Sequence, residues 1–236
     1  MGRGRVEIIT NQSIEHSQDM AIYHTEKERV AAFKQASVYP VVTTDFCAGR
    51  NPLDVVRSIL EGGAKVVQVR EKTMSDHNYL QLLKEARKLT DDFSALLIAD
   101  DRLDAALLAD ADGVHLGQDD LPCADARKLA PQLLIGVSTH NREELLAAQR
   151  DGCSYLNIGP IFATGTKSLP MNPLGTEMLT KLIPEVSVPF SVMGGIKISH
   201  LKQLHSLGCR HIAAVTAFTQ ADDPAAEIRK WIQELK

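Results

Sequence analysis

The feature that most constrains the fold is a repeated alternation along the chain. After about residue 36, a short apolar run rich in β-branched residues is followed by a loop and then by a helical pattern, and this unit recurs eight times. Continuous apolar strands that alternate with helices are typical of parallel sheets covered by helices. We therefore predict eight strands, at residues 37–43, 66–70, 95–100, 113–117, 133–139, 155–160, 189–195 and 211–217.

Helical patterns fill the intervals between these runs, for example over residues 76–93 and 141–152. The last helix is predicted over residues 223–236, with Asp223 as N-cap and Pro224 at the first helical position. Eight strand–helix units in about 200 residues predict an α/β protein with a single closed (β/α)8 TIM barrel. A doubly wound open sheet is the alternative, but no GxGxxG motif follows the first strand.

The domain organisation follows from where the alternation begins. Residues 1–36 form a polar N-terminal extension with one candidate amphipathic helix in EKERVAAFKQ, and residues 37–236 form the barrel catalytic domain. The extension could be disordered, could be an extra helix that closes the bottom of the barrel, or could contact a partner subunit. Small barrels of this kind often self-associate, so a homo-oligomer stays open.

Composition excludes several classes of partner. Apolar residues make up 44% and charged residues 24%, and the net charge of -4 argues against nucleic acid or an anionic membrane surface as partner. No apolar run approaches the roughly 18 residues of a membrane helix, and the N-terminus has no apolar signal core. The four cysteines lie far apart without a CxxC pair, which favours reduced thiols. We expect a cytoplasmic protein.

Polar side chains concentrate where the predicted strands end, which is where the active sites of TIM barrels lie. They are Gln68, Arg70 and Lys72 after the second strand, Asp100, Asp101 and Arg102 after the third, Asp119 and Asp120 after the fourth, and Ser138, Thr139 and His140 after the fifth. The sixth strand opens into the loop GPIFATGTK, the seventh ends in a glycine pair, and the eighth ends in VTA.

Each of these features also has a purely structural explanation. Asp100 or Asp101 could cap the helix that follows, and Ser138 could do the same after the fifth strand. Gly194 and Gly195 could be required only for their backbone conformation. The grouping of all these residues at one rim favours a functional interpretation over the separate structural ones.

Taken together, the strand ends predict two bound anions. Two acidic clusters on adjacent strands could hold one Mg²⁺, which usually takes one or two carboxylates and completes its shell with phosphate oxygens and water. Arg70, Lys72 and Lys167 could surround the same phosphates. The glycine- and threonine-containing loops after the last three strands could supply backbone N–H groups to a second anion. The rim thus suggests a metal-bridged diphosphate and a monophosphate.

Seven motifs in register resemble those of the thiamine-phosphate synthase / thiazole tautomerase family. They are QVREK, DDR, ADGVHLGQDDL, IGVSTH, GPIFATGTK, GGI and VTAFTQADDP, and they extend the resemblance over about residues 37–234. The resemblance implies a (β/α)8 barrel that uses Mg²⁺ to condense hydroxymethylpyrimidine diphosphate with thiazole phosphate and releases pyrophosphate. These two small molecules are the expected partners.

The resemblance also assigns residues, position by position. The implied Mg²⁺ ligands are Asp101 and Asp120. The site of the pyrimidine diphosphate would comprise Gln68, Val69, Arg70, Glu71, Lys72, Asp100, Ser138 and Lys167. The thiazole phosphate would be held by Thr164, Gly165, Thr166, Gly195, Val215 and Thr216. The catalytic contacts would come from Arg70, Lys72, Lys167 and Ser138.

The implied chemistry is dissociative and needs no general base. The amino group of the pyrimidine can stabilise a cation at its methylene once the diphosphate leaves, and the thiazole nitrogen already has a lone pair. The protein would supply charge neutralisation and positioning, and His140 is interpreted as part of the loop structure. Asp100 departs from the family pattern, in which asparagine is usual.

Three alternatives stay open beside the synthase. A thiazole tautomerase shares the fold, but it needs an acid–base residue and no metal site for a diphosphate. The set of Asp101, Asp120, Arg70 and Lys167 therefore counts against it. A phosphosugar isomerase or epimerase is compatible with the fold alone. A non-catalytic thiamine-precursor binding protein would bind its ligands without turnover, and its support is Asp100.

Overall fold

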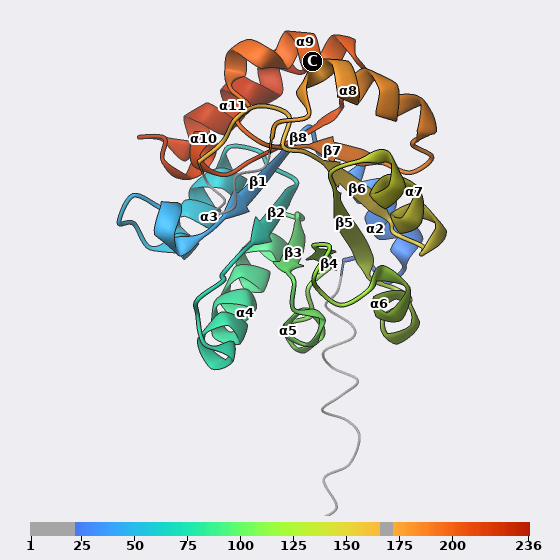
Figure 1. The fold of residues 1–236 in the computed structure, drawn as a ribbon. Helices are drawn as coiled ribbons and strands as arrows, with labels where there is room; N and C mark the ends of the chain where they lie inside the picture. Colours follow the sequence, from blue (N-terminus) through green and yellow to red (C-terminus); the bar gives the residue numbers. More distant parts are fainter. Residues whose placement is uncertain (1–21, 166–171) are drawn as a thin grey trace, which may run out of the picture.

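Eight parallel strands close into a barrel in the computed structural model, which describes residues 22–165 and 172–236. The strands pair in chain order, each with the next, and the last pairs with the first (Figure 1). Their bounds are β1 (Val38–Val42), β2 (Val66–Val69), β3 (Leu96–Asp100), β4 (Gly113–Leu116), β5 (Leu134–Thr139), β6 (Tyr155–Ile158), β7 (Phe190–Val192) and β8 (His211–Ala214).

Helices surround the strands on the outside of the barrel (Figure 1). Their bounds are α2 (Glu26–Phe33), α3 (Pro52–Glu61), α4 (Asp76–Asp92), α5 (Leu103–Leu108), α6 (Cys123–Leu129), α7 (Arg142–Arg150), α8 (Gly175–Leu182), α9 (Leu201–Ser206), α10 (Thr216–Thr219) and α11 (Pro224–Glu234). Three short 3₁₀ helices join them, η1 (Thr44–Phe46), η2 (Ile183–Glu185) and η3 (Ile198–His200). Among the described helices, none is long and apolar enough to cross a membrane.

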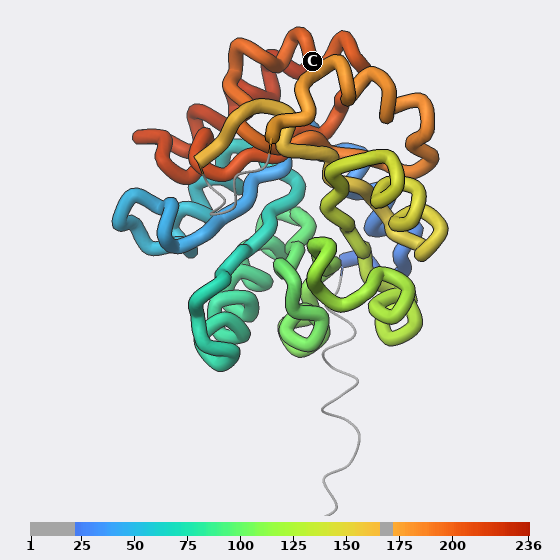
Figure 2. Tube along the Cα trace, viewed as in Figure 1, coloured from blue at the N-terminus to red at the C-terminus, as the bar shows by residue number. Residues whose placement is uncertain are grey.

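The barrel closes where the two ends of the repeated region meet. In β1 and β8, Val38 is in register with Ile212 and Pro40 with Ala214. Figure 2 shows the same closure, with the blue strand of the first unit beside the orange-red strand of the last. The carboxyl ends of all eight strands therefore share one rim, and the polar strand ends predicted from the sequence come together there.

Two apolar cores lie on the two faces of the strands. The larger one packs the outward-facing strand residues, such as Leu97 and Ile135, against the surrounding helices. The smaller one fills the barrel interior and includes Leu96 and Ile98. Because residues two apart in a strand share a face, Asp100 continues this interior row to the rim.

Helix α2 closes the end of the barrel opposite the rim. Its last residue, Phe33, stacks on Tyr155 with ring centroids 4.4 Å apart and meets Tyr39 edge-on at 5.8 Å. Thr25 caps the helix in a capping box with Glu28. The described part of the N-terminal extension thus forms the base of the barrel, while residues 1–21 lie outside the described residues.

Gly136 makes room for the ring of Tyr155 inside the barrel. A Cβ atom at this position of β5 would overlap the Cζ and hydroxyl of Tyr155, which lies in register with Gly136 on the neighbouring strand. The large ring and the missing side chain therefore fit each other, and they fill the barrel interior above Phe33 of the base.

Candidate active site

A cavity opens at the carboxyl ends of the strands. Its lining includes eight of the residues predicted from the sequence, Gln68, Arg70, Lys72, Asp100, Asp101, Asp120, Ser138 and Val215. The other residues that line it are Val41, Phe46, His115, Gly117, Asn157 and Met193. The closed barrel brings together side chains that are up to 174 positions apart in sequence, from Val41 to Val215.

Asp100 lies buried between an amide and two cations. The Nε2 of Gln68 donates a hydrogen bond to its Oδ1 at 2.5 Å. The Nε of Arg70 and the Nζ of Lys72 each lie 3.4 Å from its Oδ2. Burial first, and then the neighbouring carboxylate of Asp101, raise the pKa of Asp100, whereas the two cations lower it. Two cations of the predicted diphosphate site, Arg70 and Lys72, thus lie beside one carboxyl group.

The carboxylates of Asp101 and Asp120 form a second acidic pair. Asp101 has a left-handed backbone with φ of 60°, held by a 2.8 Å hydrogen bond from its N–H to the carbonyl of His115. The Nζ of Lys72 contacts its Oδ2. Asp120 accepts a 2.6 Å hydrogen bond from the N–H of Gly117. Burial, and then hydrogen bonding to Asp101, raise the pKa of Asp120, so the two carboxyl groups are close neighbours.

This pair fits a Mg²⁺ ion that is also bound by substrate. Within residues 22–165 and 172–236, no group of three or more His, Cys, Asp or Glu side chains converges on one point. Mg²⁺ is usually bound by only one or two carboxylates together with phosphate oxygens and water. Asp101 and Asp120 are such a donor set: both carboxyl groups line the cavity, and burial and then the neighbouring Asp101 raise the pKa of Asp120.

The alternative that Asp100 or Asp101 caps a helix is wrong. Helix α5 has Arg102 as its N-cap residue, and no side chain makes a cap hydrogen bond there. Ser138 is not a cap either, because Asn141 caps α7 through its side chain. His140 belongs to the loop structure as predicted, since its Nδ1 lies 2.8 Å from Oε2 of Glu144. Asp100, Asp101 and Ser138 therefore have no capping role, and all three line the cavity.

Tyr79 of α4 fixes the ends of β2 and β3 to each other. Its hydroxyl accepts a 2.8 Å hydrogen bond from the N–H of Asp100 and lies 2.9 Å from the carbonyl of Val69. Glu71 instead accepts hydrogen bonds from the N–H and hydroxyl of Thr44, at 2.8 and 2.7 Å. Val69 and Glu71 thus belong to the framework around the cavity. The sequence gives no sign of the role of Tyr79, because an aromatic residue on the apolar face of a helix also fits ordinary packing.

A chain of hydrogen bonds connects the base of the barrel to Ser138. The hydroxyls of Tyr39 and Tyr155 lie 2.7 Å apart, Tyr155 lies 3.0 Å from Nδ1 of His115, and Nε2 of His115 lies 2.9 Å from Oγ of Ser138. Within the described residues, the Tyr39 hydroxyl has Tyr155 as its only hydrogen-bond partner. It must therefore donate, and the donors then run in order toward Ser138. In this order Ser138 accepts from His115 and keeps its own proton for another partner.

Asn157 also lines the cavity, although it belongs to none of the seven sequence motifs. Only 6% of its surface is exposed, and its Nδ2 lies 3.7 Å from the sulfur of Met193. The available signal was a polar residue inside the apolar strand YLNI, and a single such residue is easily taken for a satisfied core amide.

The loops predicted to hold the monophosphate pack tightly on each other. The N–H of Phe162 donates to the carbonyl of Gly194 at 3.0 Å, and Gly195 has φ of 59°. A Cβ atom on Gly195 would lie 2.9 Å from the carbonyl oxygen of Phe162 and would overlap that of Ala163. Glycine is therefore required here for the close approach of two loops.

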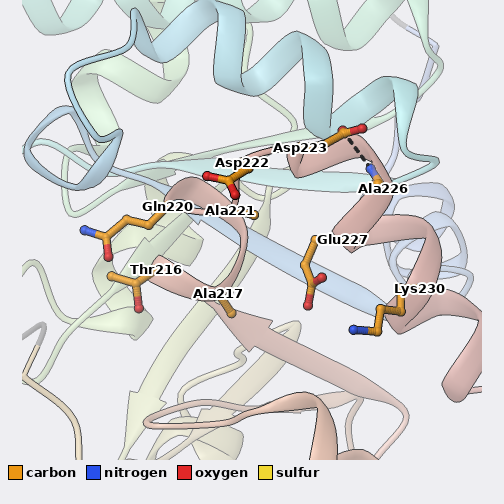
Figure 3. A pocket seen from close by; sticks show the side chains of 9 residues that line it. All are labelled: Thr216, Ala217, Gln220, Ala221, Asp222, Asp223, Ala226, Glu227 and Lys230. Atoms are coloured by element: carbon orange, nitrogen blue, oxygen red, sulfur yellow. Dashed lines mark hydrogen bonds between the residues drawn. The ribbon is translucent and has the colours of Figure 1, made fainter.

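The remaining predicted residues lie around these loops. Thr164 and Gly165 belong to the loop after β6, and Thr166 and Lys167 lie outside the described residues. Val215 precedes α10 and lines the cavity at the strand ends. Thr216, the first residue of α10, lines a different hollow, shown in Figure 3.

This second hollow is unsuited to an anion. Its charged side chains are mostly acidic, with Asp222, Asp223 and Glu227 against Lys230 (Figure 3). Asp223 is committed to the N-cap of α11, as predicted, where it accepts a 2.9 Å hydrogen bond from the N–H of Ala226. A phosphate near the end of β8 would therefore have to approach Thr216 from the side of the strand ends.

Comparison with known proteins decides the family. A family model described as thiamine monophosphate synthase matches residues 38–218, which include all eight strands. The chain belongs to the thiamine monophosphate synthase family. The family resemblance indicated by the seven motifs is thereby confirmed.

Relatives in the thiamine monophosphate synthase family match nearly the whole barrel. A thiamine-phosphate synthase of Caldicellulosiruptor bescii is 40% identical over 212 residues, which cover 89% of this chain and 95% of that protein. One of Chloroflexus aurantiacus is 42% identical over 193 residues, covering 82% of this chain and 89% of that protein. The solved structure of thiamine phosphate pyrophosphorylase from Pyrococcus furiosus superposes with a TM-score of 0.79 at 32% identity, covering 86% of this chain and 96% of that one. The predicted (β/α)8 barrel is confirmed.

Proposed function

We propose that the chain condenses hydroxymethylpyrimidine diphosphate with thiazole phosphate to give thiamine phosphate and pyrophosphate. The observation that carries the proposal is the cavity at the strand ends, where the carboxylates of Asp101 and Asp120 lie beside the cations of Arg70 and Lys72. Family membership and the thiamine-phosphate synthases among the relatives support the same reaction.

The diphosphate would bind on the side of the cavity formed by β2, β3 and β4. Asp101 and Asp120 would hold Mg²⁺, which when bound neutralises charge on the departing diphosphate. Arg70 and Lys72 now face Asp100 and Asp101, and they would exchange part of these contacts for phosphate oxygens. Lys167 is proposed to complete this charge set from the loop after β6.

The bond changes need positioning and charge rather than proton transfer. The bond from the pyrimidine methylene to the diphosphate oxygen breaks, and its electron pair leaves with pyrophosphate. The lone pair of the thiazole nitrogen then forms the new bond to the methylene carbon. Ser138 lines the cavity, and when it accepts from His115 its own proton would be available for a hydrogen bond to the pyrimidine diphosphate. The remaining contribution of the protein is to hold the two substrates in the orientation in which they react.

The thiazole phosphate would bind between the loops that follow β6, β7 and β8. Backbone N–H groups at Gly195, Val215 and Thr216 and the hydroxyls of Thr164 and Thr166 would contact its phosphate. The acidic hollow beside Thr216 supports an approach from the strand ends, because Asp222 and Glu227 would repel an anion on the other side.

The neighbouring hypotheses have weaker support. A thiazole tautomerase has no use for a pair of carboxylates beside two cations, and that pair is present at the rim. A protein that only binds thiamine precursors would show ligand binding without turnover. Its support was Asp100, which replaces the usual asparagine but is accommodated here by Gln68 and Arg70.

We propose that the reaction takes place in the cytoplasm. All four cysteines are buried free thiols, which suits a reducing compartment. Burial raises the pKa of the Cys47 thiol to about 11, so it is unreactive at neutral pH. A homo-oligomer stays a prediction, for which the exposed Leu108 and Leu129 offer one candidate surface.

The direct test is to mix the purified protein with both substrates, with and without Mg²⁺, and to measure thiamine phosphate by the fluorescence of its oxidised thiochrome. The proposal expects product that depends on Mg²⁺ and on both substrates. Binding of both ligands without product would point to a precursor-binding protein and would make Asp100→Asn the variant to try for rescue. The absence of both ligand binding and product would contradict the proposal.

A further inference from the structure

The side chain of Asn157 faces the barrel interior from the middle of β6. Its neighbours Leu156 and Ile158 belong to the outer core between strands and helices, whereas Tyr155 belongs to the core inside the barrel. Since strand residues alternate between faces, Asn157 points inward one step closer to the rim than Tyr155. It lines the same cavity as Gln68 and Asp100.

The Oδ1 atom of Asn157 is buried and has no hydrogen-bond partner among the described residues. Its amide nitrogen has only the weak contact to the sulfur of Met193, at 3.7 Å. A buried carbonyl oxygen without a partner destabilises a fold, and such groups are rare in native proteins. An amide that lines a cavity with its oxygen unsatisfied is suited to a ligand that brings an N–H donor.

The other amide of the cavity is already committed. Gln68 donates to Asp100 at 2.5 Å. Asn157 lies elsewhere in the wall of the same cavity and makes no such bond to a carboxyl group of the described residues. The Oδ1 of Asn157 can accept a hydrogen bond from a ligand, because no group of the described residues donates one to it.

We infer that Asn157 is a substrate-binding residue, whose Oδ1 accepts a hydrogen bond from the exocyclic amino group of the pyrimidine substrate. The inference rests on the proposed function and specifies how the pyrimidine is distinguished from rings without an amino group. The amino group provides two N–H donors in the plane of the ring, and burial in the cavity makes a donor without an acceptor costly. Asn157 thereby selects aminopyrimidines.

The test combines a variant of the protein with a variant of the ligand. Equilibrium binding is measured by calorimetry with Mg²⁺ for hydroxymethylpyrimidine diphosphate and for the same compound without its amino group. We expect the wild type to bind the compound without the amino group about tenfold more weakly, as for one buried hydrogen bond. Asn157→Leu should bind the aminopyrimidine about tenfold more weakly and should no longer distinguish the two compounds.

Two controls separate recognition from a structural role. Asn157→Leu removes an unsatisfied buried oxygen, so its melting temperature should equal or exceed that of the wild type, whereas a structural amide would give a lower one. Asn157→Asp keeps an acceptor in the same place and should retain the preference for the amino compound, even if the added charge weakens binding of both.

The outcomes distinguish this inference from the proposed function. If the wild type binds the aminopyrimidine diphosphate and turns it over, while Asn157→Leu still prefers the amino compound by the wild-type factor, the inference is wrong and the proposed function stands. A loss of the preference in Asn157→Asp would equally contradict acceptance by Oδ1. If the wild type neither binds nor converts the diphosphate, the proposed function is wrong and the inference falls with it.

Discussion

The base and the rim of the barrel interior differ in whether their buried side-chain oxygens have hydrogen-bond partners. At the base, the hydroxyls of Tyr39 and Tyr155 lie 2.7 Å apart beneath the stacked ring of Phe33. At the rim, Asp100 and Asn157 each carry a buried oxygen without a hydrogen-bond partner among the described residues. The same alternation of strand residues builds both ends. The base is therefore organised for stability, and the rim retains unsatisfied and like-charged groups that a ligand can use.

The hydrogen-bonded chain through His115 links these two regions. It begins at the fully buried Tyr39 and ends at Ser138, which lines the cavity. The base can therefore orient one hydroxyl of the rim without contacting a substrate. A substitution at the base should change mainly stability, and a substitution at the rim should change mainly activity. A substitution within the hydrogen-bonded chain should change both.

The largest effect is expected from removal of the ring that closes the base. Phe33→Ala leaves a cavity against Tyr39 and Tyr155 and should lower the free energy of unfolding by about 3–5 kcal/mol. Turnover per folded molecule should stay close to that of the wild type. Urea unfolding and an activity assay on the same sample measure both quantities, and Lys34→Ala, at the exposed end of the same helix, is the control. A stable but inactive Phe33→Ala would contradict the division between base and rim.

At the rim, Asp120→Asn should lower turnover without lowering stability, which is the opposite of the effect expected for Phe33→Ala. Loss of one carboxylate of the metal pair should reduce Mg²⁺-dependent turnover about a hundredfold or more. The free energy of unfolding should be unchanged or slightly higher, because two neighbouring carboxyl groups no longer repel each other. Turnover as a function of Mg²⁺ concentration, with the exposed Asp119→Asn as the matched control, measures the effect. Equal activity of the two variants would refute the metal assignment.

A smaller, mixed effect is expected in the connecting chain. Tyr155→Phe keeps the ring but removes the hydroxyl between Tyr39 and His115, which should destabilise the fold by about 1–3 kcal/mol. Turnover should fall a few-fold, because His115 loses the group that fixes its ring and hence Ser138. Tyr39→Phe serves as the comparison: it removes the first donor but leaves the Tyr155 hydroxyl beside His115, so it should lower turnover less than Tyr155→Phe does. If both variants lost the same activity, the chain would have no directed role.

The smallest effect is a pH dependence at the base. Burial lowers the pKa of His211 from its ordinary value of 6.5, against an opposing hydrogen bond to the carbonyl of Ala36. Above pH 6.5 the ring is neutral in both the folded and unfolded states. Below it the unfolded chain binds the proton first, so stability is lost as the pH falls toward the lower pKa of the folded state. Urea unfolding from pH 7 to 5 should show a smaller loss in His211→Gln than in the wild type; equal losses would contradict this assignment.

The fold could be predicted from local sequence because every strand is a continuous apolar run. All eight predicted strands form, and errors are confined to their ends. The seventh was predicted over residues 189–195 but ends at Val192, because Gly194 and Gly195 have φ of 103° and 59° and form a turn. The eighth was predicted to residue 217 but ends at Ala214, because α10 begins at Thr216. Backbone turns and short helices override apolar character at these positions.

The candidate site was predictable only where chemistry coincided with a strand end. The acidic clusters at residues 100–101 and 119–120 were conspicuous because they come at, or shortly after, the end of a buried strand, and the family resemblance then singled out Asp101 and Asp120. Asn157 and Tyr79 lie inside an apolar strand and on the apolar face of a helix, where their side chains resemble core residues. The hydrogen bonds of His115 depend on the register between β4, β5 and β6, which no local pattern specifies.

The most direct test of the rim as the active site is the position of the metal in a crystal with bound substrate. Mn²⁺ can replace Mg²⁺ in crystals grown with the pyrimidine diphosphate, and its anomalous scattering identifies its position. The account predicts one Mn²⁺ in contact with the carboxylates of Asp101 and Asp120 at the strand ends. It would be contradicted by a visible diphosphate without Mn²⁺ beside those residues, or by Mn²⁺ only in the acidic hollow of Asp222, Asp223 and Glu227 (Figure 3).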